Sequence, residues 1–221
     1  MLRSTPALRP AFLTHQAVVD SAAVFAMLVV VWTATRLVLV ALAWPDLGAP
    51  PFRLLPVFAR GFAVDLLLAA SVGSAVLAVR ALAHRGPRHP RRMRAVRAAR
   101  LAILASAAMF VAIAEVLFWD EFSARFNFIA VDYLVYTTEV VGNIRESYPL
   151  ATLLTVVATV GAGVALLLAR SFPLQLQPAW PLRARVAVSL AAIVVAVLAG
   201  RAAIGVNDDA PTAPSLRTDV R

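Results

Sequence analysis

The chain has 221 residues and a formal net charge of +9, yet only 15% of its residues are charged, while 61% are hydrophobic. With several apolar runs longer than about 18 residues, this composition excludes an ordinary soluble domain and predicts a polytopic membrane protein. Cysteine is absent, so a disulfide framework and a thiolate nucleophile are excluded as well. Every basic residue is arginine, so the positions of the arginines decide what the positive charge means.

Five membrane-spanning segments are predicted in chain order. They cover about residues 18–44, 57–82, 98–119, 150–170 and 185–206. Each has close to, or more than, the roughly 20 residues that a helix needs to cross a hydrocarbon core of about 30 Å. Backbone N–H and C=O groups must be paired internally in lipid, so we expect helices. The predicted fold is all-α, with five transmembrane helices in one domain.

Shorter segments flank and connect these spans. Residues 1–17 precede the transmembrane domain 18–206, and residues 207–221 are Pro-rich and polar, which predicts a disordered tail. Between the third and fourth spans, residues 120–149 are predicted to lie at the membrane interface. The first apolar run is too long for a signal peptide and lacks a small-residue cleavage site, so we expect it to remain as an anchor.

The arginines predict which side of the membrane each connection occupies. The link between the second and third spans, residues 84–100, contains seven arginines and no acidic residue, whereas residues 120–149 hold two arginines among several carboxylates. By the positive-inside rule the link and the N-terminus are cytoplasmic, and residues 120–149 and the C-terminus are outside. Arg53 and Arg60 would lie outside, which is a mild violation of the rule.

The basic link permits two interpretations. A nucleic-acid surface would need stacking aromatic residues or a recognition fold, and the link has neither. A topology determinant that faces anionic lipid needs only charge. We therefore expect no nucleic-acid partner. The three histidines, His15, His84 and His89, are expected to be solvated flanking residues rather than metal ligands.

A few ionisable residues lie within the spans, where each costs about 2.5 to 3.5 kcal/mol. Arg36 and Asp65 both lie about 12 Å below the outer surface, at a rise of 1.5 Å per residue, so they can pair and link the first two helices. Glu115 is about one turn from the outer end of the third span, where it can reach the interface or a neighbouring helix. Asp20 is expected to be an ordinary residue at the cytoplasmic edge.

A second hypothesis treats Arg36, Asp65 and Glu115 as the intramembrane site of a small ion or solute transporter. Against it, these residues are few and mostly near the span ends. The sequence also shows no paired broken helices and no evident internal repeat of the kind typical of transporters.

The acidic and aromatic segment 118–148, which we call the outer segment, holds all three tyrosines. Its large apolar residues recur at intervals of three or four: Phe122, Phe126, Ile129, Tyr133, Tyr136, Val140 and Ile144. This period predicts an amphipathic helix. Arg125, Asp132, Glu139 and Glu146 recur every seven residues along one polar stripe. We expect one or two interfacial helices, with aromatic rings at headgroup depth and carboxylates toward water or another domain.

Three strings in this region carry a family resemblance. FWDEFSARFNFIAVDYL and YTTEVVGNIRESYP in the outer segment, and RGFAVDLLLA in the second span, resemble the membrane domain of bacterial lipoteichoic acid synthase-like proteins. These are phosphoglycerol transferases and sulfatase-like enzymes of the alkaline phosphatase superfamily. The resemblance extends over about residues 58–149 and agrees with five spans and an outside C-terminus.

The resemblance implies a bacterial plasma-membrane anchor for a large extracytoplasmic catalytic domain. In the family that domain holds a divalent metal, often manganese, and a threonine nucleophile that takes a phosphoglycerol group from phosphatidylglycerol. This chain contains no sulfatase-type nucleophile motif, and the segment 207–221 is too short to fold. We therefore assign no catalytic residue, metal ligand or cofactor to it. Two explanations stay open: a truncated product of a longer enzyme gene, or a standalone membrane subunit serving a separately encoded partner.

Both explanations make the outer segment a surface for docking the catalytic domain or presenting a lipid headgroup. The candidate residues are Asp120, Glu121, Arg125, Asn127, Asp132, Tyr133, Tyr136, Glu139, Asn143, Arg145 and Glu146. Arg125 and Arg145 are the expected phosphate contacts, because guanidinium binds phosphate bidentately. The alternative is that the segment is a connector whose polar residues simply face water.

Overall fold

A computed structural model describes residues 15–46, 52, 54–83, 89–123, 142, 145–146, 148–174 and 180–208. Its long helices are α1 (Gln16–Ala43), α2 (Leu54–Ala83), α3 (Pro90–Phe122), α6 (Leu150–Ser171) and α7 (Leu182–Asp208). A short 3-10 helix, η1 (Trp44–Asp46), follows α1, and the described ranges contain no strand. All five long helices are long and apolar enough to cross a membrane. The predicted all-α fold with five spans is confirmed.

The start of the third helix differs from the prediction. Helix α3 begins at Pro90 rather than near residue 98, so the second half of the basic link is helical. Proline is favoured in the first turn of a helix, because its φ is already set and its missing N–H would have no partner there. Arginine and alanine, which dominate the following turns, are good helix formers. The helix therefore starts well before the apolar run, and it carries its arginines in a fixed register.

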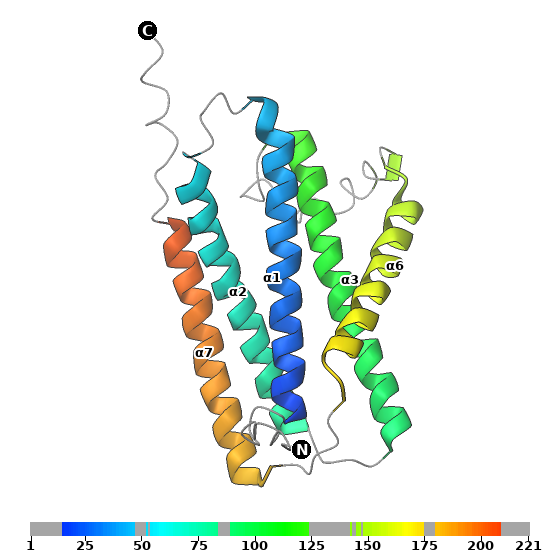
Figure 1. The fold of residues 1–221 in the computed structure, drawn as a ribbon, viewed down its shortest axis with the longest axis vertical. Helices are drawn as coiled ribbons and strands as arrows, with labels where there is room; N and C mark the ends of the chain where they lie inside the picture. The colour runs from blue at the N-terminus through cyan, green and yellow to red at the C-terminus, as the bar shows by residue number, and fades with distance from the viewer. Residues whose placement is uncertain are drawn as a thin grey trace, which may run out of the picture.

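The five helices stand side by side in the spatial order α7, α2, α1, α3, α6 (Figure 1). Their direction alternates along the chain, so the neighbours α1 and α3 run parallel and the other packed pairs run antiparallel. Helix α1 is central and packs against both α2 and α3, while α7 packs on α2 and α6 packs on α3. The starts of α1, α3 and α7 and the ends of α2 and α6 lie together, and we call this the arginine-rich end. The end of α3, the start of α6 and the end of α7 lie at the opposite end (Figure 1).

Small and aliphatic side chains form the buried core between α1, α2, α3 and α6. They are Ala23, Val24, Met27, Leu28, Val31, Ala69, Leu101, Ala105, Ala108, Ala112, Ala165 and Leu168. On α3 the buried positions recur every three or four residues and so share one face. Many large apolar side chains on other faces, such as Ile103 and Leu190, remain exposed, as a helix surface in contact with lipid requires.

Glycine permits the closest helix contacts. A Cβ atom at Gly161 of α6 would lie 2.7 Å from the Cα atom of Ser106 of α3, closer than real Cβ atoms approach. Near the arginine-rich end, Ser21 of α1 donates a hydrogen bond to the Gly73 carbonyl of α2 at 2.6 Å. Helices in lipid associate through such close packing and interhelical hydrogen bonds, since lipid tails are as apolar as the side chains.

Two arginines connect α2 and α7 at both of their ends. Arg185, in the first turn of α7, donates a hydrogen bond to the carbonyl of Ala81 at the end of α2 at 3.0 Å. Arg60, near the start of α2, donates to the carbonyl of Val206 at the end of α7 at 3.0 Å. The last carbonyls of a helix have no partner within the helix, so each arginine satisfies one. This contact gives Arg60, which departed from the positive-inside pattern, a structural role.

Two serines add hydrogen bonds between the same helices. The hydroxyl of Ser71 donates to the carbonyl of Ala196 at 2.8 Å, and that of Ser189 donates to the carbonyl of Ala78 at 3.0 Å. Such bonds contribute about 0.6 kcal/mol each in a membrane. Helix α7 is therefore fixed to α2 along its length.

Candidate functional site

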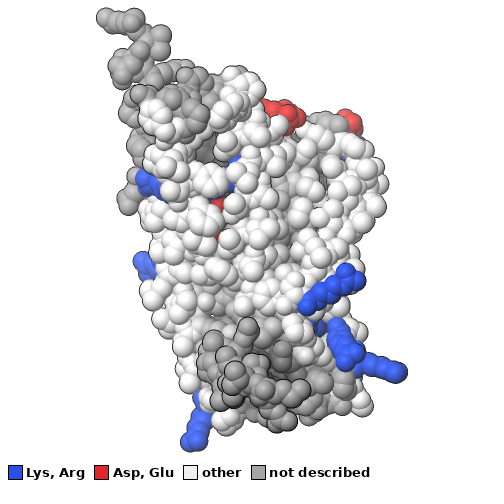
Figure 2. All heavy atoms as spheres, viewed as in Figure 1, with Lys and Arg blue, Asp and Glu red and all other residues white. Residues whose placement is uncertain are grey.

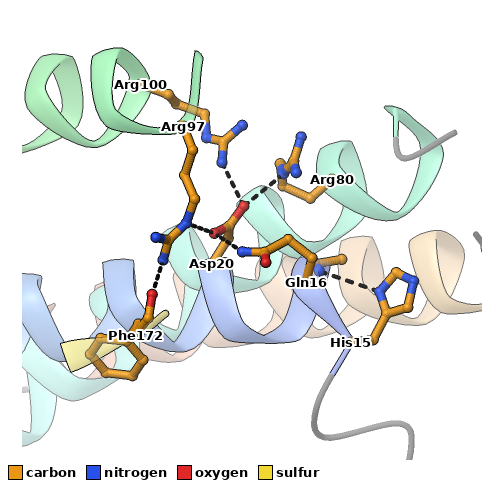
Figure 3. A network of polar contacts seen from close by, with 8 residues as sticks. His15, Gln16, Asp20, Arg80, Arg97, Arg100 and Phe172 are labelled. Atoms are coloured by element: carbon orange, nitrogen blue, oxygen red, sulfur yellow. Dashed lines mark hydrogen bonds and ion pairs between the residues drawn. The ribbon is translucent and has the colours of Figure 1, made fainter. Parts of the chain in front are cut away.

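A buried charge cluster is centred on Asp20, which lies in the second turn of α1 and is only 1% exposed. Its Oδ1 accepts hydrogen bonds from Arg97 Nε at 2.8 Å and Gln16 Nε2 at 2.6 Å. Its Oδ2 accepts from Arg80 Nε at 3.0 Å and Arg100 Nη2 at 2.5 Å (Figure 3). A carboxylate has about four acceptor positions, so the two oxygens are saturated. We call these five residues the Asp20 cluster.

The members of the Asp20 cluster come from three helices, and a fourth is attached to it. Arg80 is in the last turn of α2, and Arg97 and Arg100 lie three positions apart on one side of α3. Arg97 also donates through Nη2 to the carbonyl of Phe172, which ends α6, at 2.5 Å (Figure 3). The cluster thus connects α1, α2, α3 and α6 at the arginine-rich end.

The Asp20 cluster has more positive than negative charge. Three arginines surround one carboxylate, which gives a formal charge of +2. The side chain of Arg97 is 6% exposed, that of Arg80 is 17% exposed and that of Arg100 is 26% exposed. The carboxylate is therefore inside, while two of the guanidinium groups lie partly at the surface.

His15 and Trp180 lie at the same end of the bundle. His15 precedes α1 and its Nδ1 accepts a hydrogen bond from the Ala17 amide at 3.3 Å. Its ring stacks on Trp180, with centroids 3.7 Å apart and planes 19° apart. The prediction that His15 is solvated is wrong, because the residue is buried in this stack. His89 is exposed, and His84 lies outside the described residues.

Arg36 and Asp65 form the ion pair that their equal depth suggested. Nε and Nη2 of Arg36 both donate to Oδ2 of Asp65, at 3.0 and 2.7 Å. The guanidinium lies 6.0 Å from the centroid of the Phe58 ring. It also occupies the space that a side chain at Gly61 would need. This neutral pair connects α1 and α2 in the half of the bundle away from the Asp20 cluster.

The outer segment is described only at its edges. Asp120 and Glu121 in the last turn of α3, and Arg145 and Glu146 before α6, are exposed. The remaining candidates lie outside the described residues: Arg125, Asn127, Asp132, Tyr133, Tyr136, Glu139 and Asn143. The amphipathic helix expected there stays a prediction. Glu115 is buried and has an interaction partner.

The Asp20 cluster was not predicted from the sequence. Asp20 was expected to be an ordinary edge residue and the arginines of residues 84–100 to face lipid, but Arg97 and Arg100 turn inward to the carboxylate. One signal was present: Asp20 is the only acidic residue near the predicted cytoplasmic ends of the spans. A single carboxylate among many arginines, close to an apolar core, is a strong candidate for a buried partner.

No family model matches the chain, and neither a curated protein nor a solved structure matches it. What the chain does must therefore be inferred from its own residues. Within the described ranges, no group of three or more His, Asp or Glu residues is placed to hold a metal ion. The divalent metal implied by the resemblance has no ligand set in that part of the chain.

Proposed function

We propose that the chain is the membrane anchor of a bacterial lipoteichoic acid synthase-like enzyme, a phosphoglycerol transferase or sulfatase-like protein. Its role is to hold an extracytoplasmic catalytic domain, in the same chain or in a partner, at the membrane surface. One observation carries the anchor role: the buried charges join helices. The Asp20 cluster connects four helices and Arg36–Asp65 connects two, and these contacts support a structural role for the bundle over a transport role.

The end opposite the arginine-rich end is the proposed docking side. The last turn of α3, the start of α6 and the end of α7 lie there together (Figure 1). On the face shown in Figure 2, carboxylates lie in the upper half and arginines project mostly from the lower half. By the positive-inside rule, the acidic end faces outward and the N-terminus is cytoplasmic. A domain that docks on the outer segment would share this side with the end of α7.

The lipid substrate of the family gives the outer segment its proposed second role. Arg125 and Arg145 contact the phosphate of phosphatidylglycerol, and the neighbouring carboxylates face the catalytic domain. Arg145 is exposed, as a residue that meets a headgroup must be. The test is phosphatidylglycerol binding by the purified chain with both arginines replaced by alanine. We expect weaker binding, and unchanged binding would remove the headgroup role.

Transport through Arg36, Asp65 and Glu115 is the weaker proposal. Arg36 already donates two hydrogen bonds to Asp65, so an ion could pass only by breaking a buried pair. Two observations separate the anchor and transporter hypotheses: the coding sequence downstream of Arg221, and solute flux after reconstitution into liposomes. A phosphatase-like domain encoded there and no solute flux would support the anchor. Flux without any such domain would overturn it.

Orientation can be measured directly, because the chain has no cysteine. We would introduce single cysteines at the exposed positions Glu121, Glu146 and Arg94, and treat intact cells with a membrane-impermeant maleimide. Glu121→Cys and Glu146→Cys are expected to be labelled from outside, and Arg94→Cys only after permeabilisation. The reverse pattern would place the proposed docking side in the cytoplasm.

A further inference from the structure

The arginines of the Asp20 cluster have N–H donors that the described hydrogen bonds do not use. Among the described residues, both oxygens of Asp20 already accept two hydrogen bonds each. A guanidinium has five N–H donors, and the bonds described use one in Arg80, one in Arg100 and two in Arg97. On the three arginines the spare groups are therefore all donors. A ligand of these arginines must be an acceptor, and the formal charge of +2 favours an anion.

The exposure of the arginines shows where such an anion can approach. Arg97 is nearly fully buried between Asp20 and the carbonyl of Phe172, whereas Arg80 and Arg100 keep 17% and 26% of their side-chain surface. Both of these arginines bind the same oxygen, Asp20 Oδ2, so their guanidinium groups lie close together although they come from α2 and α3. Figure 3 shows them on the same side of the carboxylate. They form a two-armed donor site at the surface of the bundle.

A tryptophan near this site indicates that it lies at the level of a membrane interface. The arginine-rich end contains Trp180, which stacks on His15, and tryptophan is enriched at membrane interfaces. Basic pockets between transmembrane helices on the cytoplasmic side bind anionic headgroups. Two adjacent guanidinium groups match the oxygens of a phosphate group.

We propose that Arg80 and Arg100 bind one phosphate group, from an anionic lipid headgroup or from a soluble phosphate, with Asp20 and Arg97 holding the two arginines in place. Binding of a phosphate explains why a buried carboxylate is surrounded by three arginines when one would neutralise it. The bound phosphate removes the remaining positive charge. This site lies at the end of the bundle opposite the end of α3 and the start of α6, and it does not depend on the anchor role.

The test uses the full chain purified in a zwitterionic detergent, with Arg125 and Arg145 replaced by alanine in every sample so that the proposed outer headgroup contacts do not contribute. Its midpoint of thermal unfolding is followed during titration with short-chain phosphatidylglycerol, short-chain phosphatidylcholine or inorganic phosphate. The variants are Arg80→Gln and Arg100→Gln. The matched control is Arg94→Gln, an exposed arginine on α3, the helix that carries Arg100. Arg80→Lys and Arg100→Lys keep the charge and serve if a glutamine variant fails to fold.

Phosphatidylglycerol, but not phosphatidylcholine, is expected to raise the unfolding midpoint of this parent chain and of its Arg94→Gln variant. Each glutamine variant is expected to weaken the apparent affinity about tenfold or more, because each removes charge-assisted hydrogen bonds. The lysine variants weaken it as well, since they lose the planar fork. An equal effect of inorganic phosphate identifies a soluble phosphate as the source. The proposal is overturned if Arg94→Gln weakens binding as much, if the Arg80 and Arg100 variants bind normally, or if neither phosphate compound binds.

Discussion

The two buried charge sites of the bundle differ in stoichiometry. Arg36 and Asp65 form a one-to-one pair that is neutral and joins two helices. In the Asp20 cluster three arginines share one carboxylate, so the site is positive and joins four helices. Both sites lie among apolar helices, where an unpaired charge is costly. The difference in stoichiometry therefore determines which residues of each site can be removed without leaving a buried charge unpaired.

In the neutral pair, neither partner can be removed without leaving an uncompensated charge. In the Asp20 cluster the single carboxylate is indispensable, whereas each arginine has two others to replace part of its charge. We therefore expect symmetric losses at Arg36 and Asp65 but asymmetric losses in the Asp20 cluster. The neutral pair needs nothing from outside the chain, while the Asp20 cluster can accept an anion.

Replacing Asp20 by alanine is expected to have the largest effect. It leaves Arg80, Arg97 and Arg100 facing one another without an anion and breaks a buried ion-pair network. We expect a loss of about 3 to 5 kcal/mol in the free energy of unfolding, measured by unfolding in mixed micelles. The control is Asp120→Ala at the exposed end of α3, which should change stability by less than about 0.5 kcal/mol. Equal stability of the two variants would contradict the indispensable role of the carboxylate.

Arg36→Met and Asp65→Leu are expected to cost about 3 kcal/mol each, because each leaves one buried charge of the pair without its partner. The double variant should recover most of this loss, since a buried ion pair is often replaced by apolar residues without penalty. A double-mutant cycle in the same micelles measures the coupling between the two positions. Simple addition of the two losses would show that the ion pair does not bind the helices together.

Gly161→Ala tests a close helix contact, and its effect on stability can be compared with the effects of the charge variants. A Cβ at this position meets the backbone of Ser106, so α6 must move away from α3 at a cost of about 1 to 3 kcal/mol. Gly163, two positions along the same helix, has open space where a Cβ would lie, with no described atom within 4 Å. Gly163→Ala is therefore expected to be neutral or to stabilise by up to about 1 kcal/mol. Equal effects of the two changes, measured by the same unfolding assay, would show that the packing of α6 on α3 does not depend on the missing side chain at Gly161.

The sequence predicted the five spans and the Arg36–Asp65 pair for physical reasons. Apolar runs of sufficient length have few alternatives to a membrane-spanning helix. Two opposite charges at the same depth on consecutive helices have few alternatives to each other. In both cases one strong physical constraint, the length of an apolar run or the depth of a charge, can be read directly from residue positions in the sequence.

The order of the helices and the Asp20 cluster were not predictable in the same way. In lipid all faces of a helix are apolar, so no amphipathic pattern indicates that α7 packs on α2 through Ser71 and Ser189. Asp20 is near a span end, where water and burial both satisfy a carboxylate. The early start of α3 at Pro90 adds Arg97 to the helical face of Arg100, and this face reaches Asp20.

The smallest expected effect is that of Arg100→Ala, and it makes the sharpest distinction between the two sites. Asp20 keeps Arg80, Arg97 and Gln16 as donors, and the formal charge of the cluster falls to +1 because one of three arginines is lost. In a zwitterionic detergent we therefore expect a change within about 1 kcal/mol, well below the loss for Arg36→Met. In micelles that contain anionic lipid the wild type gains a phosphate ligand that the variant binds weakly, so the difference between them should grow. A loss in zwitterionic detergent as large as that of Arg36→Met would mean that all three arginines are required for folding.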